Sequence, residues 1–121
     1  MRNEEKYLAL FPDGSFRWIH TQHDHMCSAF REVIGCEWLE NVSLPYGFCC
    51  VVDECGKIKQ DPQPFNHLAS RFYPGTYYGD PLVGPVVFCR IGLYEGESDW
   101  VPLRDDDLRI IELITGKKVP A

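Results

Sequence analysis

Two short segments near the N-terminus, 7–11 and 16–20, are rich in aromatic and branched residues. Such segments favour β-strands. Between them lies Pro12-Asp13-Gly14-Ser15, a run of turn-forming residues. The pattern predicts an N-terminal β-hairpin, with Phe16 and Trp18 on one face of its second strand.

The next group of apolar residues recurs every three or four positions, which is the spacing of a helix face. It comprises Met26, Ala29, Phe30, Val33 and Ile34. Asp24 is placed to cap the start of this helix, and Gly35 stands where helices often end in the left-handed conformation. We therefore expect a short amphipathic helix that ends at Gly35.

The centre of the chain predicts a strand that is buried on both faces. Residues 48–52 are apolar at every position and too few for a long helix. An extended segment, 36–44, precedes them, and a tight turn at 53–56 follows, in which Gly56 would supply a positive φ. Lys57-Ile58-Lys59 then alternates as an edge strand would.

Apolar residues after position 64 predict a second short helix and a long strand. The helix is marked by Phe65, Leu68, Ala69 and Phe72. It would end at Pro74-Gly75 and be followed by a loop at 76–80. Residues 83–93 are expected to form a strand that Gly84-Pro85 bends near its start. A polar turn at 95–99 separates this strand from a short extended segment at Trp100-Val101.

The C-terminal helix is predicted from its charges and its apolar face. Asp105, Asp106 and Asp107 crowd its first turn, where carboxylates favour the positive end of the helix dipole. Gly116 would end it. The side chains expected to face the core are Leu108, Ile111 and Ile114.

These elements do not alternate strictly between strand and helix, so the α+β class is favoured over a doubly wound sheet. We expect a single small domain over residues 1–121, with a mostly antiparallel or mixed sheet of about five strands and three short helices. Residues 116–121 would form a short tail.

The acidic residues are concentrated toward the C-terminus. The net charge is −6, and residues 95–112 hold seven carboxylates against two arginines, a net of −5. This excess argues against free nucleic acid as a partner, because phosphate binding requires a basic face. A solvated helix start accounts for the acidity, and a surface for a basic partner protein is the alternative.

Cysteine use and hydropathy bear on the compartment. No secretory leader and no apolar run of membrane-spanning length is recognisable, so we expect a cytoplasmic protein without membrane contact. In a reducing compartment the six cysteines are expected to be free thiols, mostly packed as small hydrophobic side chains.

No residue pattern predicts a catalytic, metal or cofactor site. His20, His23, His25 and Cys27 are close in sequence but lack the two paired elements of a zinc site. Acidic neighbours would raise the pKa of Cys55 and weaken it as a nucleophile. Asp53 and Glu54 point apart on an extended chain, and phosphate-loop glycine motifs are missing.

One region remains as a candidate binding site. Asn66 is placed to cap the second helix, and a ligand or partner could contact that helix start together with the 53–57 turn and the 80–84 loop. The candidate residues are Asp53, Glu54, Gly56, Lys57, Asn66, Asp80 and Gly84.

These residues also carry a family resemblance. Val51-Val52-Asp53-Glu54-Cys55-Gly56-Lys57, then Asn66, then Asp80-Pro-Leu-Val-Gly84 before an apolar strand, resembles the family called domain of unknown function 3846, over about residues 7–112. The resemblance implies a small cytoplasmic α+β protein of bacteria, phages and mobile elements, with no established reaction. Accessory genes of such elements often encode small inhibitors of host systems.

We therefore expect a non-enzymatic binding or regulatory protein that acts on a protein partner. The alternative is a small-ligand or nucleotide-sequestering protein that uses Asn66, Lys57 and Lys59. A small hydrolase is a third hypothesis, and it requires a deep pocket with two converging titratable groups.

Overall fold

Alternate side chains of the central strands enter two separate apolar layers. The computed structural model describes residues 4–58 and 62–121. In β1 (Glu5–Leu10), Leu8 and Leu10 face one layer, Tyr7 and Ala9 face the other, and all four are fully buried. Such two-sided burial requires a cover on each face of the sheet.

The sheet contains six strands, and every pairing between them is antiparallel. Its order is β2 (Phe16–Thr21), β1, β5 (Val86–Tyr94), β4 (Cys49–Asp53) and β3 (Leu39–Ser43), and β6 (Glu97–Val101) lies off this path and pairs with β5. The expected α+β class is confirmed.

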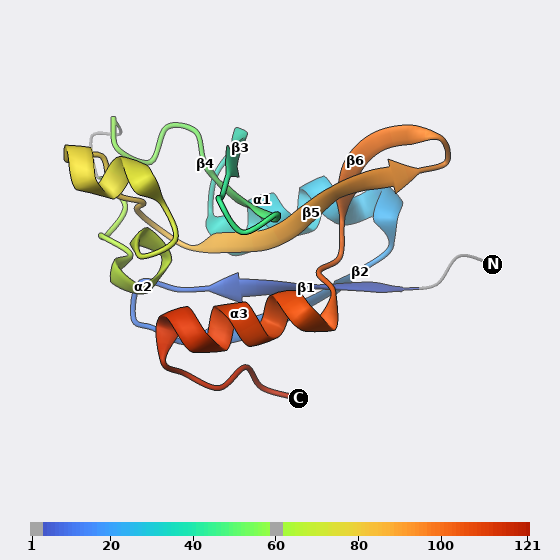
Figure 1. The fold of residues 1–121 in the computed structure, drawn as a ribbon. Helices are drawn as coiled ribbons and strands as arrows, with labels where there is room; N and C mark the ends of the chain where they lie inside the picture. The colour runs from blue at the N-terminus through green and yellow to red at the C-terminus, as the bar shows by residue number, and fades with distance from the viewer. Residues whose placement is uncertain (1–3, 59–61) are drawn as a thin grey trace.

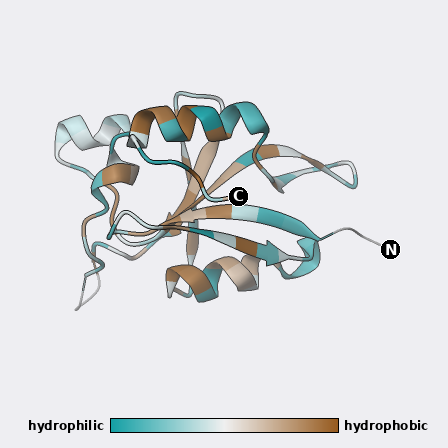
Figure 2. Cartoon of the chain, turned by 90° about the horizontal axis from the view of Figure 1, so that it is seen from below, coloured by the Kyte–Doolittle hydropathy of each residue, from teal (hydrophilic) through white to brown (hydrophobic). Residues whose placement is uncertain are grey.

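Helices cover both faces of this sheet (Figure 1). α1 (Met26–Ile34) lies on one face, and α3 (Asp105–Thr115) lies on the other with α2 (His67–Ser70). Seen from below, the helices carry their apolar residues on the side that faces the strands (Figure 2). Two 3₁₀ helices complete the chain, η1 (His23–His25) and η2 (Pro74–Tyr78).

Several local predictions are confirmed. β1 and β2 form the expected hairpin, in which Leu10 pairs with Phe16. β4 is buried at all five positions. Gly35 ends α1 with φ 77° and Gly116 ends α3 with φ 69°, both in the left-handed region that glycine tolerates.

Gly56 lies in the predicted turn, but the positive φ predicted for it is wrong. Its φ is not positive, but a Cβ there would lie 3.1 Å from Val83 Cγ2. Glycine therefore favours the close packing against the neighbouring loop, because a larger residue would push Val83 aside by a few tenths of an ångström. The edge strand predicted at 57–59 is also not formed, because Lys57 and Ile58 continue the turn, while Lys59 lies outside the described residues.

Three other boundaries differ from prediction. α1 begins at Met26 after the turn η1, so Asp24 lies inside that turn and is not the N-cap. Residues 76–80 are not simply a loop, since Pro74-Gly75 opens η2. The polar segment expected as a turn at 95–99 is mostly strand, because Glu95 and Gly96, with φ of 52° and 83°, make a turn short enough for β6 to begin at Glu97.

The acidic C-terminal region is divided between two elements. Glu97 and Asp99 belong to β6, whereas Asp105, Asp106 and Asp107 belong to α3. These carboxylates therefore do not form the one acidic element that the sequence pattern indicated.

Asp107 of α3 is buried and forms an ion pair with Arg90 of β5. It is 1% exposed, and its Oδ2 and Oδ1 accept hydrogen bonds from Arg90 Nε at 2.7 Å and Arg90 Nη2 at 2.9 Å. Oδ2 also accepts the backbone N–H of Arg104 at 2.8 Å. Burial acts to raise the pKa of this carboxyl, but the hydrogen bonds outweigh burial and lower the pKa below its ordinary value.

Asp107→Ala is expected to lower the free energy of unfolding by about 3 kcal/mol, because it leaves Arg90 without its buried partner. Since the folded-state pKa of Asp107 is depressed, this stabilisation is present above the unfolded pKa of about 3.9 and is lost as the pH falls through the folded value. Urea unfolding of both proteins at a series of pH values measures it. Asp106→Ala, whose exposed side chain lies 3.9 Å from Arg109, is the matched control and should change stability by less than about 0.5 kcal/mol.

Candidate functional site

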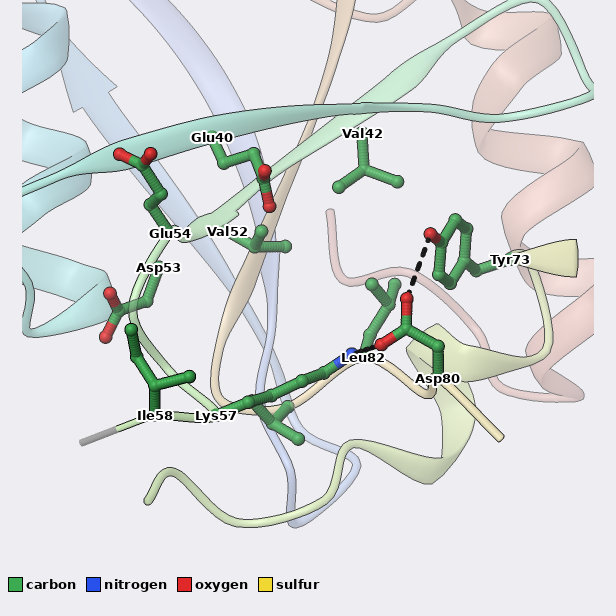
Figure 3. Close-up of a pocket in the computed structure, with 11 residues that line it drawn as sticks. Glu40, Val42, Val52, Asp53, Glu54, Lys57, Ile58, Tyr73, Asp80 and Leu82 are labelled. Carbon is green, nitrogen blue, oxygen red and sulfur yellow. Dashed lines mark hydrogen bonds and ion pairs between the residues drawn. The ribbon is translucent and has the colours of Figure 1, made fainter. Parts of the chain in front are cut away.

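A depression of about 230 Å³ opens beside the end of β4 and the chain around η2. Figure 3 shows that the residues around it come from β3, from the end of β4 and the turn after it, and from the segment around η2, with Lys57 reaching toward Asp80. Its lining consists of Glu40, Val42, Val52, Asp53, Glu54, Lys57, Ile58, Tyr73, Asp80, Leu82 and Val83.

Asp80 connects two sides of this depression. Lys57 Nζ donates to Asp80 Oδ1, and Tyr73 OH lies 3.5 Å from Asp80 Oδ2 (Figure 3). Burial and the neighbouring Asp80 carboxylate raise the pKa of Tyr73, so its hydroxyl remains a hydrogen-bond donor at neutral pH.

The lining is acidic over an aliphatic floor. Four of the lining residues carry a carboxylate and one, Lys57, carries an ammonium, which gives the described lining a net charge of −3. The aliphatic part comes from Val42, Val52, Leu82 and Val83. This arrangement suits a group that is positively charged at its tip and apolar along its stem.

Asp53 holds the turn that shapes one wall. Its side chain is buried, and Oδ1 accepts the backbone N–H of Cys55 at 2.9 Å. The Gly56 N–H also donates to the Asp53 carbonyl oxygen at 3.1 Å, which closes the turn. Asp53 therefore has the turn-forming role expected of an Asp that bonds to the backbone two residues on.

The structure brings four of the seven candidate residues to the depression: Asp53, Glu54, Lys57 and Asp80. Gly56 does not line the depression, but it packs closely against Val83, which does. Asn66 and Gly84 are buried outside the lining.

Asn66 joins three segments of the backbone. Its Nδ2 donates to Leu10 O at 3.1 Å and to Gly84 O at 2.9 Å, and its Oδ1 accepts the N–H of Ala69 at 3.1 Å. The last bond is the N-cap of α2 that the sequence predicted. Asn66 is 1% exposed, and its side-chain amide is bonded to the protein in this way. It therefore holds together the segments beside the depression and does not line it.

The sequence did not predict the other seven lining residues, among them Glu40, Tyr73 and Ile58. Glu40 comes from β3, where it pairs with Val52 of β4, and only the strand register places it there. Tyr73 follows α2, and η2 turns the chain so that Tyr73 lies beside Asp80. Ile58 was assigned to a strand, so its place on the rim was not anticipated.

The candidate metal ligands and nucleophiles lie elsewhere and are separated. No group of three or more metal-ligating side chains is found within 4–58 and 62–121. The ring nitrogens of His23 contact Glu5 and Asp99, and His20 Nδ1 lies 3.3 Å from Glu4. Cys55 is half-buried and lies beyond the lining of this depression.

Burial explains the behaviour of the thiols on the sheet. Cys49, Cys50 and Cys89 are buried in the two apolar layers. Burial raises the pKa of Cys49 to about 11 and those of Cys50 and Cys89 well above the usual value. They pack as small apolar side chains, as expected for free cysteine in a core.

A family model described as domain of unknown function (DUF3846) matches residues 7–115. The chain belongs to the DUF3846 family. The match covers the strands that form the depression and both segments of the predicted motif, so the resemblance seen in the sequence is confirmed. Comparisons of this DUF3846 protein with curated proteins and with solved structures give no match. Within the described part of the chain, every helix is too short or too polar to span a bilayer.

Asn66→Ala is expected to destabilise the DUF3846 protein by about 2–3 kcal/mol, because buried carbonyls of Leu10 and Gly84 and the N–H of Ala69 lose their partner. Chemical denaturation monitored by tryptophan fluorescence measures the change. His67→Ala, on the exposed neighbouring position, is the control and should lie within about 0.5 kcal/mol of the parent. Equal stability of Asn66→Ala and the parent would contradict the structural role.

Proposed function

We propose that this DUF3846 protein is a non-enzymatic binding and regulatory protein, which recognises a basic segment of a partner protein at the acidic depression. The observation that carries the proposal is the combination of four carboxylates with an aliphatic floor in one concave site. A Lys or Arg side chain of the partner matches both features, since its stem is apolar and its head is cationic.

Exposed apolar side chains beside the depression support a protein partner. Ile58 on the rim is 82% exposed, and Tyr77 and Tyr78 of η2 are 89% and 87% exposed. η2 and the turn that follows β4 lie at the same end of the molecule (Figure 1). Tyrosine is enriched at protein interfaces because it contributes a large contact area at a low cost in conformational entropy.

The alternative of a nucleotide-sequestering protein has less support. Lys57 is engaged by Asp80, and the carboxylates around it would repel phosphate groups. The helix start at Asn66 is capped by its own side chain, which occupies the N–H of Ala69. Of the groups expected to hold phosphate, Lys57 and Asn66 are thus already bonded within the protein, and Lys59 lies outside the described residues.

The biological setting follows from the family resemblance. We propose a cytoplasmic protein of a bacterium, phage or mobile element, whose partner is a host or phage protein. Modulation of a host defence system is the role that fits a small acidic binding protein from such a source, because an acidic surface can compete with nucleic acid for a basic partner.

Selection of a displayed random-peptide library on the full chain should enrich peptides that contain Arg or Lys next to apolar residues. Binding of a selected peptide, measured by fluorescence anisotropy, should weaken about fivefold in a Glu40→Gln, Glu54→Gln double variant, because about 1 kcal/mol of exposed charge attraction is removed. It should also weaken as salt is added.

Asp105→Asn, an exposed charge change on the distant α3, is the matched control and should leave peptide affinity unchanged. Enrichment of acidic or uncharged peptides, or equal losses in the control and the double variant, would contradict recognition of a basic segment at the depression.

Tyr77→Ala and Tyr78→Ala together are expected to weaken the selected peptide by about tenfold, the effect of losing aromatic anchors at an interface. Thermal stability should stay within about 0.5 kcal/mol of the parent, since both side chains are exposed. Leu113→Ala on α3, which removes an apolar side chain of comparable exposure, should change neither property. Unchanged affinity in the tyrosine variant would show that η2 is not part of the interface.

A further inference from the structure

A buried histidine connects three segments on the side of the molecule away from the depression's lining. His23 Nδ1 lies 2.7 Å from Glu5 Oε1 of β1, and His23 Nε2 lies 2.8 Å from Asp99 Oδ2 of β6. The imidazole ring stacks on Tyr94 of β5, with 3.6 Å between centroids and 10° between planes. The His23 side chain is 7% exposed.

The two short contacts require a particular protonation state. A neutral imidazole has one N–H donor and one lone pair, whereas an imidazolium donates from both nitrogens. With carboxylate oxygens at hydrogen-bond distance from both nitrogens, only the doubly protonated ring makes both contacts favourable. Loss of one proton would direct a lone pair of His23 at a carboxylate oxygen, so one of the contacts would break.

The described lining of the depression beside His23 contains acidic groups and, apart from His23, no basic side chain. Glu5 also accepts a hydrogen bond from Tyr7 OH at 2.8 Å, and burial raises the pKa of that phenol, so its proton is retained. The other ionisable groups in the adjoining depression are acids from the η1 turn, α1, β5, the β5–β6 turn and β6: Asp24, Cys27, Tyr94, Glu95, Glu97 and Asp99. Among the described residues of this region, the charge of His23 alone offsets Glu5 and Asp99.

The Asp99 contact is the one expected to open. The Asp99 side chain is 41% exposed, against 18% for Glu5, so water can replace the histidine there at lower cost. Asp99 Oδ1 also accepts the backbone N–H of Trp100 at 2.7 Å, so the carboxylate keeps a local partner after release. Among the described strands β6 pairs only with β5, and the bridge is thus an attachment of the β5–β6 hairpin to β1.

We propose that the Glu5–His23–Asp99 bridge is a proton-controlled latch, which holds the β5–β6 hairpin against β1 while His23 is protonated and releases it when His23 loses a proton. The latch involves none of the residues that line the acidic depression. It is a conformational device that acts at the opposite end of β5 from the β4 and β1 pairings.

The direction of the pH response follows from the carboxylates. Burial acts to lower the pKa of His23, but the hydrogen bonds and charges of Asp99 and Glu5 outweigh burial and raise the pKa above 6.5. The stabilisation by the bridge is therefore complete below the unfolded pKa of about 6.5 and is lost as the pH rises through the folded value.

The test is a titration of the full chain between about pH 5 and about pH 9 by NMR, which follows Nδ1 and Nε2 of His23 and the amide hydrogen exchange of β6. Both nitrogens should be protonated at the acidic end and titrate above about 6.5. Protection of the β6 amides, corrected for the intrinsic exchange rate, should be lower above the His23 titration than below it. The expected ratio is about tenfold for each unit by which the folded-state pKa of His23 exceeds its unfolded value. β1–β5 pairing at Leu8–Leu10 should keep its protection.

Asp99→Asn should lower the pKa of His23 and remove the pH dependence of β6 protection, while His20→Gln, at an exposed histidine paired with Glu4, should alter neither. The titration of the parent protein does not depend on any variant folding. A neutral His23 at about pH 5, or β6 protection that is the same on both sides of the His23 titration, would overturn the latch.

Discussion

The fold depends on the burial of its central strands from both sides. β1, β4 and the first half of β5 send successive side chains into opposite apolar layers, so neither face of the sheet's centre can remain in water. α1 and α3 supply the two covers. In the chain, the strands β3 to β6 lie between them. The long connection from β4 to β5 is then left to cross one end of the sheet, and it forms the acidic depression there.

That connection is ordered by a few hydrogen bonds rather than by a long regular element. α2 has four residues, and η2 has five. Asn66 fixes the start of α2 to β1 through Leu10 O and to the loop before β5 through Gly84 O, and Ser70 Oγ adds contacts to Leu82 and Asn66 backbone groups. The recognition surface that we propose therefore rests on short segments held by buried polar contacts, which keeps its exposed tyrosines near the carboxylates.

Sequence patterns predicted the parts of this structure that local chemistry determines. The β1–β2 turn, the left-handed end of α1 at Gly35 and the N-cap at Asn66 follow from residue types whose backbone preferences are strong. The two-sided burial of β4 followed from its continuous apolar run. Four residues of the depression were found because they flank the turn after β4 and the loop before β5.

What the sequence did not reveal depends on register and on tertiary pairing. Glu40 joins the depression only because β3 aligns it with Val52. The buried state of Asp107 and the two-sided contact of His23 each need a partner about 17 residues or more away, and no local pattern distinguishes these residues from solvated acids and histidines. Gly56 was assigned to the correct turn, but packing against Val83 rather than φ explains the glycine.

The carboxylate of Asp107 has a consequence for the order of folding. One side chain accepts hydrogen bonds both from the N–H of Arg104, the residue that precedes α3, and from the guanidinium of Arg90 in β5. The cap is local to the helix and can form before docking, whereas Arg90 gains its carboxylate partner only once α3 lies on β5. Fraying of the first turn of α3 would therefore also disturb the Arg90 pair, which couples the start of the last helix to its packing on the sheet.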